Sequence, residues 1–152
     1  MENTGFYRSA DGLSIAYINL YDMDFFENEN KLSEICSEFI LKCQTKTISN
    51  LNYGGIDILI TNQPPCLDQS AQSDINLLNV QKVIAYSTKL LKPRYHICLS
   101  NRFLEHIPYI NHESLMEKAK LPTRLIEIQK YGQESSKKSQ YAFKIDPIAK
   151  FS

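Results

Sequence analysis

The chain has 152 residues, enough for one domain with a real core, and 43% of them are hydrophobic. Its 17 basic and 17 acidic side chains cancel, so composition gives no overall electrostatic attraction to nucleic acid or to a membrane surface. No apolar run approaches the ~18 residues of a membrane span, and the first residues do not resemble a signal peptide, so we expect no membrane partner.

The four cysteines are not spaced as a redox or metal motif. They form no Cys-x-x-Cys pair and no Cys/His group with zinc spacing: Cys36, Cys43, Cys66 and Cys98. Free Cys is among the most buried residue types, so we interpret all four as core thiols in a reducing compartment. That compartment is the cytosol or the nucleus.

The first predicted element is a β-hairpin. Residues 6–8 and 13–20 are β-prone and flank a turn that contains Asp11 and Gly12. Neither set of alternating side chains in the second run demands solvent, with Leu13, Ile15 and Tyr17 on one face and Ser14, Ala16 and Ile18 on the other. We therefore expect the second strand to be covered on both sides.

A helix is predicted over residues 31–44, after an acidic, Asn-rich loop at 21–30. Its apolar residues recur at helical spacing and form one stripe: Leu32, Ile35, Cys36, Phe39, Ile40 and Cys43. Two of the cysteines lie on this stripe, which favours packing over redox chemistry for them.

Residues 56–61 form a short apolar run that follows Gly54 and Gly55 and ends in a polar turn and two prolines. Such a run predicts a strand that is buried on both faces. Thr61, Asn62 and Gln63 follow at its carboxyl end, where open α/β sheets usually place their chemistry.

A second helix is predicted over residues 74–91, and Pro93 stops it. Residues 95–99 form another short apolar run. Strand, helix and strand in succession predict a βαβ unit with parallel strands and a right-handed crossover.

The last third of the chain has a mixed pattern. Residues 101–121 are predicted to form a loop with a helical turn around 114–120. Residues 124–131 and 140–145 are β-like and are joined by the polar residues 132–138, so we expect a second hairpin. The order of elements predicts the α/β class, with one βαβ unit between flanking β-hairpins.

Few residues have the spacing that catalysis requires. The three histidines, His96, His106 and His112, are not paired at metal-ligand spacing, and His96 falls within a predicted strand, which favours a hydrogen-bonded structural role. The chain has neither a Gly-x-Ser-x-Gly elbow nor a Gly-rich phosphate loop. Asp57 is either a buried acid with a tuned pKa or, more commonly for this position, a hydrogen-bond partner of nearby backbone.

Basic residues near aromatic ones form three groups in the sequence: Lys89, Lys92, Arg94 and Arg102; Lys118, Lys120 and Arg124; Lys137 and Lys138. With Tyr95, Phe103, Tyr109 and Tyr131 nearby, they can follow a phosphate backbone and stack on bases. At zero net charge, an ordinary solvated surface is the favoured alternative.

Four sequence blocks carry a family resemblance. They are GIDILIT at 55–61 with Pro65, LKPRYH at 91–96, IPYINH at 107–112, and PTRLI at 122–126 leading to YAFKI at 141–145. Together they resemble the N-terminal domain of the CwfJ family, the Cwf-nineteen-like spliceosome-associated proteins. That domain is similar to the lariat debranching enzyme, a calcineurin-like metallophosphoesterase.

The resemblance implies a partial metallophosphoesterase sandwich. Residues 1–152 would form a single, degenerate and incomplete domain, because the family's opening βαβ half has no counterpart before Gly5 and its carboxy-terminal domains have none after Ser152. We therefore expect a truncated member of the family.

The resemblance also implies that the metal ligands are lost. The positions that carry histidines in the debranching enzyme correspond here to Asn62, Ser100 and Arg102. An Asn carbonyl is a weaker ligand than an imidazole, and an arginine repels a divalent ion. We therefore expect no catalytic residue, no metal and no cofactor.

The function implied by the resemblance is a non-catalytic, nuclear module in mRNA splicing and intron-lariat turnover. Its expected partners are a late spliceosomal complex, the lariat debranching enzyme or branched RNA itself. The candidate RNA or partner contacts are Lys92, Arg94, Tyr95, Arg102, Tyr109 and Arg124. The alternatives are a residual metal-dependent RNA phosphodiesterase and a fragment without independent function.

Overall fold

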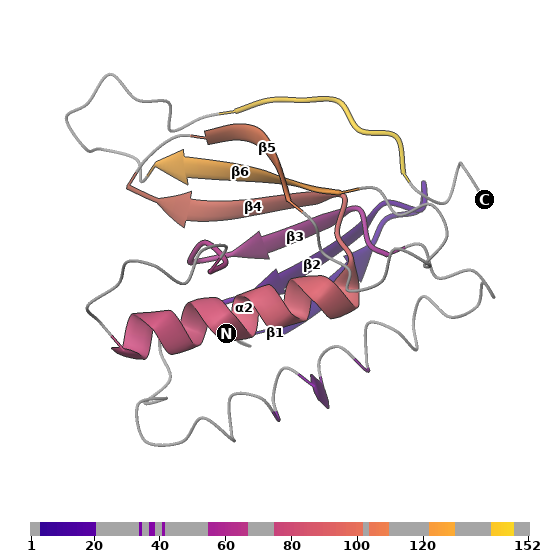
Figure 1. The fold of residues 1–152 in the computed structure, drawn as a ribbon. Helices are drawn as coiled ribbons and strands as arrows, with labels where there is room; N and C mark the ends of the chain where they lie inside the picture. Colours follow the sequence, from indigo (N-terminus) through magenta and orange to yellow (C-terminus); the bar gives the residue numbers. More distant parts are fainter. Residues whose placement is uncertain are drawn as a thin grey trace.

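The described part of the chain is a mixed α/β structure with a six-stranded sheet, in the order β1-β2-β3-β4-β6-β5 (Figure 1). This confirms the α/β class. The computed structural model describes residues 4–20, 34, 37–38, 41, 55–66, 75–101, 104–109, 122–129 and 141–147. None of the helices in these ranges is long and apolar enough to cross a membrane.

The predicted first hairpin is confirmed. Strands β1 (Thr4–Arg8) and β2 (Ser14–Ile18) pair in antiparallel fashion. The turn closes because the Ser9 N–H donates to Leu13 O and the Gly12 N–H donates to Ser9 O. Gly12 has a φ of 89°, a left-handed conformation that glycine adopts without steric cost.

The predicted βαβ unit is also confirmed. Strand β3 (Ile58–Thr61), helix α2 (Ile75–Leu91) and strand β4 (Tyr95–Ser100) follow one another, and β3 pairs in parallel with both β2 and β4. Gly55 lies where the chain enters β3, with a φ of 102°. A Cβ atom there would lie 2.1 Å from the backbone oxygen of Lys92, so only glycine allows the strand to start this close to the end of the helix.

The core lies between α2 and one face of the sheet. It is formed by apolar side chains from β2, β3 and α2 that are at most 1% exposed, including Ala16, Ile18, Leu59, Ile84 and Leu91. The alternate residues of the same strands point to the other face. There Tyr17 is 38% exposed and Ile60 is 43% exposed, so the prediction that these two strands are covered on both sides was wrong. The sequence was apolar on both faces, but α2 covers only one of them.

The carboxy-terminal third differs from its prediction. Residues 104–109, expected in a loop, form the edge strand β5 (Leu104–Tyr109), which is antiparallel to β6 (Thr123–Gln129). Strand β6 is also parallel to β4, so both of its edges are occupied. The expected hairpin with residues 140–145 was therefore wrong. Proline is tolerated at a sheet edge, and Pro108 in β5 is consistent with that position.

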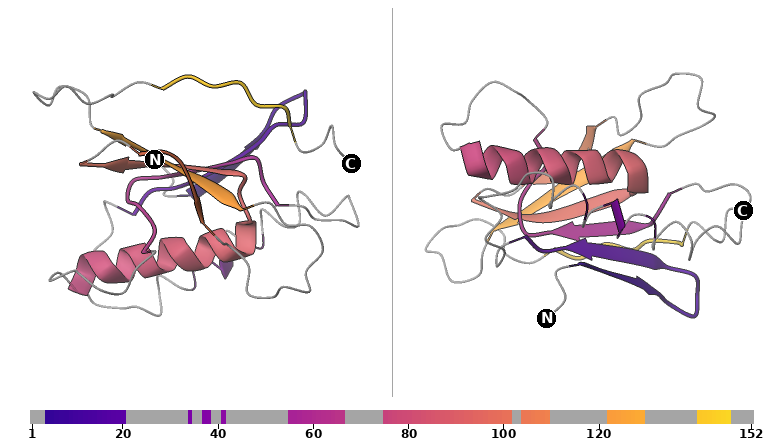
Figure 2. Two further views of the ribbon diagram at one scale, coloured as in Figure 1. Left: turned by 45° about the horizontal axis from the view of Figure 1, so that its top comes forward. Right: turned by 90° about the horizontal axis from the view of Figure 1, so that it is seen from below.

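Residues 141–147 instead run in an extended conformation across the face of the sheet opposite α2, as the yellow segment in Figure 2 shows. Phe143 stacks there against Tyr95 of β4, with ring centroids 4.8 Å apart. These residues belong to no described strand. The second sheet of a metallophosphoesterase sandwich therefore stays a prediction.

Of the helix predicted over residues 31–44, four residues are described. Glu34, Ser37, Glu38 and Leu41 are helical and exposed, and none of them belongs to the predicted apolar stripe. The apolar stripe, the helical turn around 114–120 and the loop 132–138 lie outside the described residues.

Candidate functional site

The carboxyl ends of β2, β3 and β4 lie at one edge of the sheet, because the three strands are parallel. Two of the three degenerate ligand positions, Asn62 and Ser100, follow β3 and end β4 at this edge, and both are half-buried. The third, Arg102, lies outside the described residues.

Asn62 has a structural partner. Its side-chain Oδ1 accepts a hydrogen bond from the Leu20 N–H at 3.2 Å, which ties the end of β3 to the segment that leaves β2. The amide oxygen is the atom through which asparagine binds a metal. Here that atom already satisfies a backbone donor.

A buried hydrogen-bond chain lies close to Asn62, and it links three elements. Thr61 of β3 lies 2.8 Å from Nε2 of His96 in β4, and Nδ1 of the same ring lies 3.0 Å from the hydroxyl of Tyr109 in β5. His96 is 0% exposed. The prediction that His96 is a hydrogen-bonded structural histidine is confirmed.

The hydrogen-bond pattern assigns the tautomer of this ring. The Thr61 hydroxyl donates its proton to Gln63 O at 2.6 Å, so its oxygen accepts the Nε2–H of His96. Nδ1 is then the acceptor, and the Tyr109 hydroxyl donates to it. Neither nitrogen of the neutral ring is left over to bind a metal.

Burial also determines the protonation states of His96 and Tyr109. Desolvation lowers the pKa of His96 to about 3, so the ring is neutral at physiological pH. Desolvation likewise raises the pKa of the Tyr109 phenol above its usual range, although the Thr88 and Thr123 hydroxyls oppose the rise. The cluster is therefore uncharged under ordinary conditions.

The described residues at this edge do not fit a two-metal site. Such a site needs several His, Asp and Asn ligands that converge on open positions. Asn62 and His96 are engaged in internal hydrogen bonds, and no group of three or more His, Cys, Asp or Glu side chains in the described ranges could hold a metal ion.

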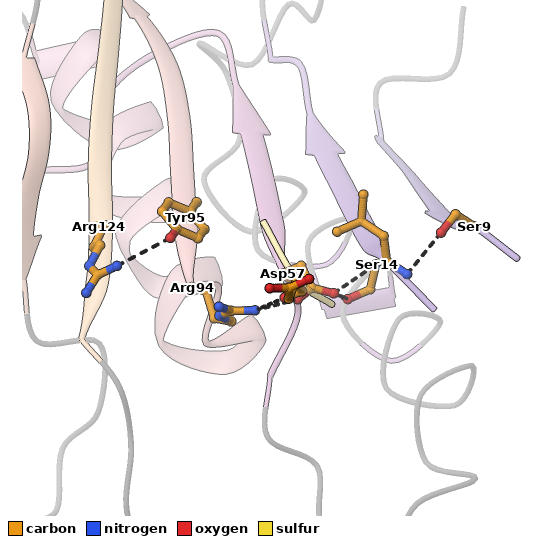
Figure 3. A network of polar contacts seen from close by, with 8 residues as sticks. Ser9, Ser14, Asp57, Arg94, Tyr95 and Arg124 are labelled. Atoms are coloured by element: carbon orange, nitrogen blue, oxygen red, sulfur yellow. Dashed lines mark hydrogen bonds and ion pairs between the residues drawn. The ribbon is translucent and has the colours of Figure 1, made fainter. Parts of the chain in front are cut away.

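A second polar cluster lies at the amino ends of the same strands (Figure 3). Asp57, which is 0% exposed, accepts hydrogen bonds at one carboxylate oxygen from the Ser14 N–H at 2.9 Å and the Ser14 hydroxyl at 2.8 Å. The Asp57 N–H donates back to the Ser14 hydroxyl oxygen at 2.9 Å. Of the two roles considered for Asp57, the structure supports the hydrogen-bonding one.

Arg94 completes this second cluster. Its Nη1 lies 3.2 Å from the other carboxylate oxygen of Asp57, and it also donates to the backbone oxygen of Asp146. The arginine side chain is 19% exposed, whereas that of the aspartate is 0% exposed. Arg94 therefore connects the inside of the sheet to the segment 141–147.

Three of the six candidate RNA or partner contacts meet at this end of the sheet. The Arg94 and Arg124 guanidinium carbons lie 5.8 Å and 5.9 Å from the centre of the Tyr95 ring, and Arg124 also donates to the Tyr95 hydroxyl at 3.3 Å. Tyr95 is 7% exposed and Phe143 covers it, so its ring is not open to a base. Arg124 is exposed.

The other candidates lie elsewhere. Lys92 is half-buried at the end of α2, and its φ of 46° together with an N–H bond to Thr88 O gives it a role in ending the helix. Tyr109 belongs to the neutral cluster with His96 and pairs with Thr123, the first residue of β6. Arg102 is outside the described residues.

Two structural roles were missed from the sequence. Ser14 was placed only on one face of a covered strand, and residues 140–145 were assigned to the wrong pairing. One available signal was the charge of Asp57 within an apolar run, with Arg94 directly before the neighbouring predicted strand. In a parallel pair, residues at corresponding strand starts are neighbours, which makes them natural ion-pair partners.

Comparison with known proteins gives a consistent result at low identity. No family model matches the chain. It is 28% identical to CWF19-like protein 1 of Mus musculus over 149 residues, which are 95% of this chain and 27% of that protein. It is 36% identical to the Homo sapiens protein of the same name over 102 residues, which are 63% of this chain and 19% of that protein.

A homologue in Caenorhabditis elegans, named CWF19-like protein 1 homolog, is 27% identical over 157 residues, or 96% of this chain and 27% of that protein. The chain thus spans about a quarter of the length of the curated relatives that it matches along most of its own length.

Proposed function

Because this chain belongs to the CwfJ family, we propose that it is a non-catalytic module that acts in mRNA splicing and intron-lariat turnover by binding other components. The proposed partner is a late spliceosomal complex or the lariat debranching enzyme, and the proposed location is the nucleus. The module would hold or modulate the machinery that handles the branched intron.

One observation supports the non-catalytic part of this proposal. Asn62, at the carboxyl end of β3, is hydrogen-bonded to the Leu20 N–H, and His96, near the start of β4, is hydrogen-bonded on both sides of its ring. A hydrolytic site needs the reverse arrangement, with ligands and a base turned toward a substrate.

The rival proposal, a residual metal-dependent RNA phosphodiesterase, is tested by metal content and turnover. We expect the purified chain, after incubation with manganese, zinc or iron and desalting, to retain less than one metal ion per molecule. We also expect it to leave a branched RNA intact. Stoichiometric metal together with cleavage of the 2′–5′ linkage would replace our proposal with the enzymatic one.

The binding function is tested with purified components. The full chain, immobilised through one terminus, should retain the lariat debranching enzyme or a late spliceosomal complex from defined preparations, and a heat-unfolded sample should not. Retention of neither partner would refute the proposal. The remaining alternative, a fragment without independent function, predicts a non-cooperative thermal transition by circular dichroism, whereas we expect a cooperative one.

A further inference from the structure

Tyr95, at the amino end of β4, has one aromatic ring and two guanidinium groups around it. The ring of Phe143 stacks on it with centroids 4.8 Å apart and a tilt of 40°. The guanidinium carbons of Arg94 and Arg124 lie 5.8 Å and 5.9 Å from the centre of the Tyr95 ring, which is cation–π distance. A flat ring with cations beside it is the combination that holds a base and its phosphate.

Arg124 is an exposed cation without a counter-ion in the part of the chain that the structure describes. No described carboxylate forms an ion pair with it. Its guanidinium donates one long hydrogen bond, of 3.3 Å, to the Tyr95 hydroxyl, and Figure 3 shows the two side chains next to each other on adjacent strands. The guanidinium carries five N–H donors in a fixed plane, which suits the oxygens of a phosphate.

Residues 141–147 occupy the positions that a nucleotide would take here, and we call them the strap. Phe143 lies on the Tyr95 ring, where a base would stack, and the backbone oxygen of Asp146 accepts a hydrogen bond from Arg94, as a phosphate oxygen would. Alternate strap residues are half-buried and exposed, which is the pattern of an extended chain with one side against the sheet. The half-buried ones are Tyr141, Phe143 and Ile145, and the exposed ones are Ala142, Lys144 and Asp146.

The cluster beneath the strap stays paired when the strap leaves. The strap residues belong to no described strand, so their release opens no ladder of strand hydrogen bonds. Arg94 keeps its ion pair with Asp57 at 3.2 Å, so the buried carboxylate is not left without its cation.

A phosphate has an advantage over the strap as an acceptor. The Asp146 oxygen that Arg94 now binds is a neutral carbonyl, and hydrogen bonds to an ionised acceptor are roughly twice as strong. A phosphate also supplies the negative charge for Arg124, whereas Phe143 brings none. The charge of Arg94 is compensated by Asp57, so Arg124 contributes most of the attraction to an anion.

We propose that Tyr95, Arg94 and Arg124 bind one nucleotide unit of a single-stranded nucleic acid, and that the strap is an autoinhibitory element which this ligand displaces. In the open form the base stacks on Tyr95 in place of Phe143, and the phosphate binds the guanidinium groups. The site adds nucleic acid to the proposed protein-binding function and does not depend on it, since retention of a protein partner and affinity for an oligonucleotide are measured separately.

The probe is fluorescein-labelled octauridylate, added to the full chain at low salt and followed by fluorescence anisotropy. An abasic octamer of the same charge is the matched probe, because it keeps the phosphates and lacks the bases. We expect octauridylate to bind more tightly by about fivefold or more, a modest value for the stacking of one base. Arg124→Gln should weaken the binding of both probes.

The strap is tested by a change of opposite sign. Phe143→Ala should tighten the binding of octauridylate by about threefold or more, because a larger fraction of the molecules then has the site open. In the wild-type chain, hydrogen exchange of the strap amides should become faster when octauridylate binds. Tyr86→Ala and Lys82→Ala remove an exposed ring and an exposed cation from α2, on the opposite face, and should change neither affinity.

Four results would overturn the proposal. Equal affinity for the two probes would mean that no base stacks on Tyr95. Unchanged binding in Arg124→Gln would remove the phosphate contact. Unchanged or weaker binding in Phe143→Ala, with strap amides that exchange no faster in the complex, would mean that the strap does not inhibit. Displacement of octauridylate by micromolar uridine monophosphate would assign the site to a free nucleotide and not to a strand.

Discussion

Two clusters in the sheet bury polar side chains in different ways. At the amino ends of the parallel strands, Ser14, Asp57 and Arg94 form an ion-paired cluster. Thr61 at the end of β3, His96 near the start of β4 and Tyr109 of β5 form a neutral cluster within the sheet. Each cluster links three elements, and each contains a side chain that is 0% exposed. Both satisfy buried polar groups, but only the first contains formal charge.

The difference follows from access to solvent. Arg94 is 19% exposed and reaches the segment 141–147, so the ion pair keeps one side in water and avoids part of the desolvation cost. His96 has no such outlet, and burial excludes the protonated form of its ring. The ion-paired cluster therefore fixes charged groups in place, whereas the neutral cluster depends on remaining uncharged.

The largest effect is expected when the ion-paired cluster loses its carboxylate. Asp57→Ala removes the partner of Arg94 and of two Ser14 donors, so we expect the free energy of unfolding to fall by about 3 kcal/mol. Urea denaturation followed by circular dichroism measures this loss, and Asp11→Ala is the control. Asp11 is exposed in the first turn, and its replacement should change stability by less than about 0.5 kcal/mol. A loss below about 1 kcal/mol for Asp57→Ala would show that the ion pair is dispensable.

The neutral cluster predicts a specific dependence on pH. The folded-state pKa of His96 is lowered to about 3, so between pH 3 and 6.5 the unfolded chain binds a proton that the folded chain refuses. Stability from this residue is therefore complete above pH 6.5 and is lost as the pH falls. At pH 5 the loss is about 2 kcal/mol, from roughly 1.5 pH units at 1.36 kcal/mol each.

Because other groups also titrate in acid, the test compares slopes. The free energy of unfolding of the wild-type chain between pH 6.5 and 5 should fall more steeply than that of His96→Gln, by an amount that approaches one proton per molecule. Equal slopes in the two proteins would mean that the ring accepts a proton in the folded state, contrary to its burial.

A smaller effect is expected when the neutral cluster loses one donor. Tyr109→Phe leaves Nδ1 of His96 without its hydrogen bond while it preserves the aromatic volume, and we expect a loss of about 1 kcal/mol. Tyr86→Phe, which removes an exposed hydroxyl from α2, is the control and should be neutral. Nitrogen-15 chemical shifts of the ring at neutral pH report the tautomer directly, and a protonated Nδ1 in the wild-type chain would contradict the assignment.

The sequence was sufficient for those parts of the fold in which local pattern and burial agree. The first hairpin follows from its Asp11-Gly12 turn, and the βαβ unit follows from two short apolar runs around a helical pattern that Pro93 ends. His96 was correctly predicted to be structural, because an isolated histidine within an apolar strand lacks any ligand spacing.

The rest depended on contacts between segments that are distant in sequence. Strand β5 contains a glutamate, a histidine and a proline, so its local pattern resembles a loop, and only its pairing with β6 makes it a strand. The exposure of Ile60 could not be predicted either, because an apolar residue shows no sign of whether a second layer covers it. The use of Ser14 by Asp57 joins residues 43 positions apart and has no local signal.

The smallest effect on stability is expected at Arg124, and this residue extends the comparison to RNA. Its guanidinium is exposed and donates one long hydrogen bond to Tyr95, so Arg124→Ala should change the free energy of unfolding by less than about 0.5 kcal/mol. If this end of the sheet also contacts branched RNA, the same variant should weaken RNA binding at low salt and reduce the salt dependence by about one phosphate contact. Fluorescence anisotropy over a salt titration measures both, with Lys82→Ala, an exposed cation on α2, as the control.

Because Arg94 is held by Asp57 and Tyr95 is covered by Phe143, Arg124 is the one of these three with a side chain open to a phosphate. Unchanged RNA affinity in Arg124→Ala would therefore leave this end of the sheet with a structural role alone.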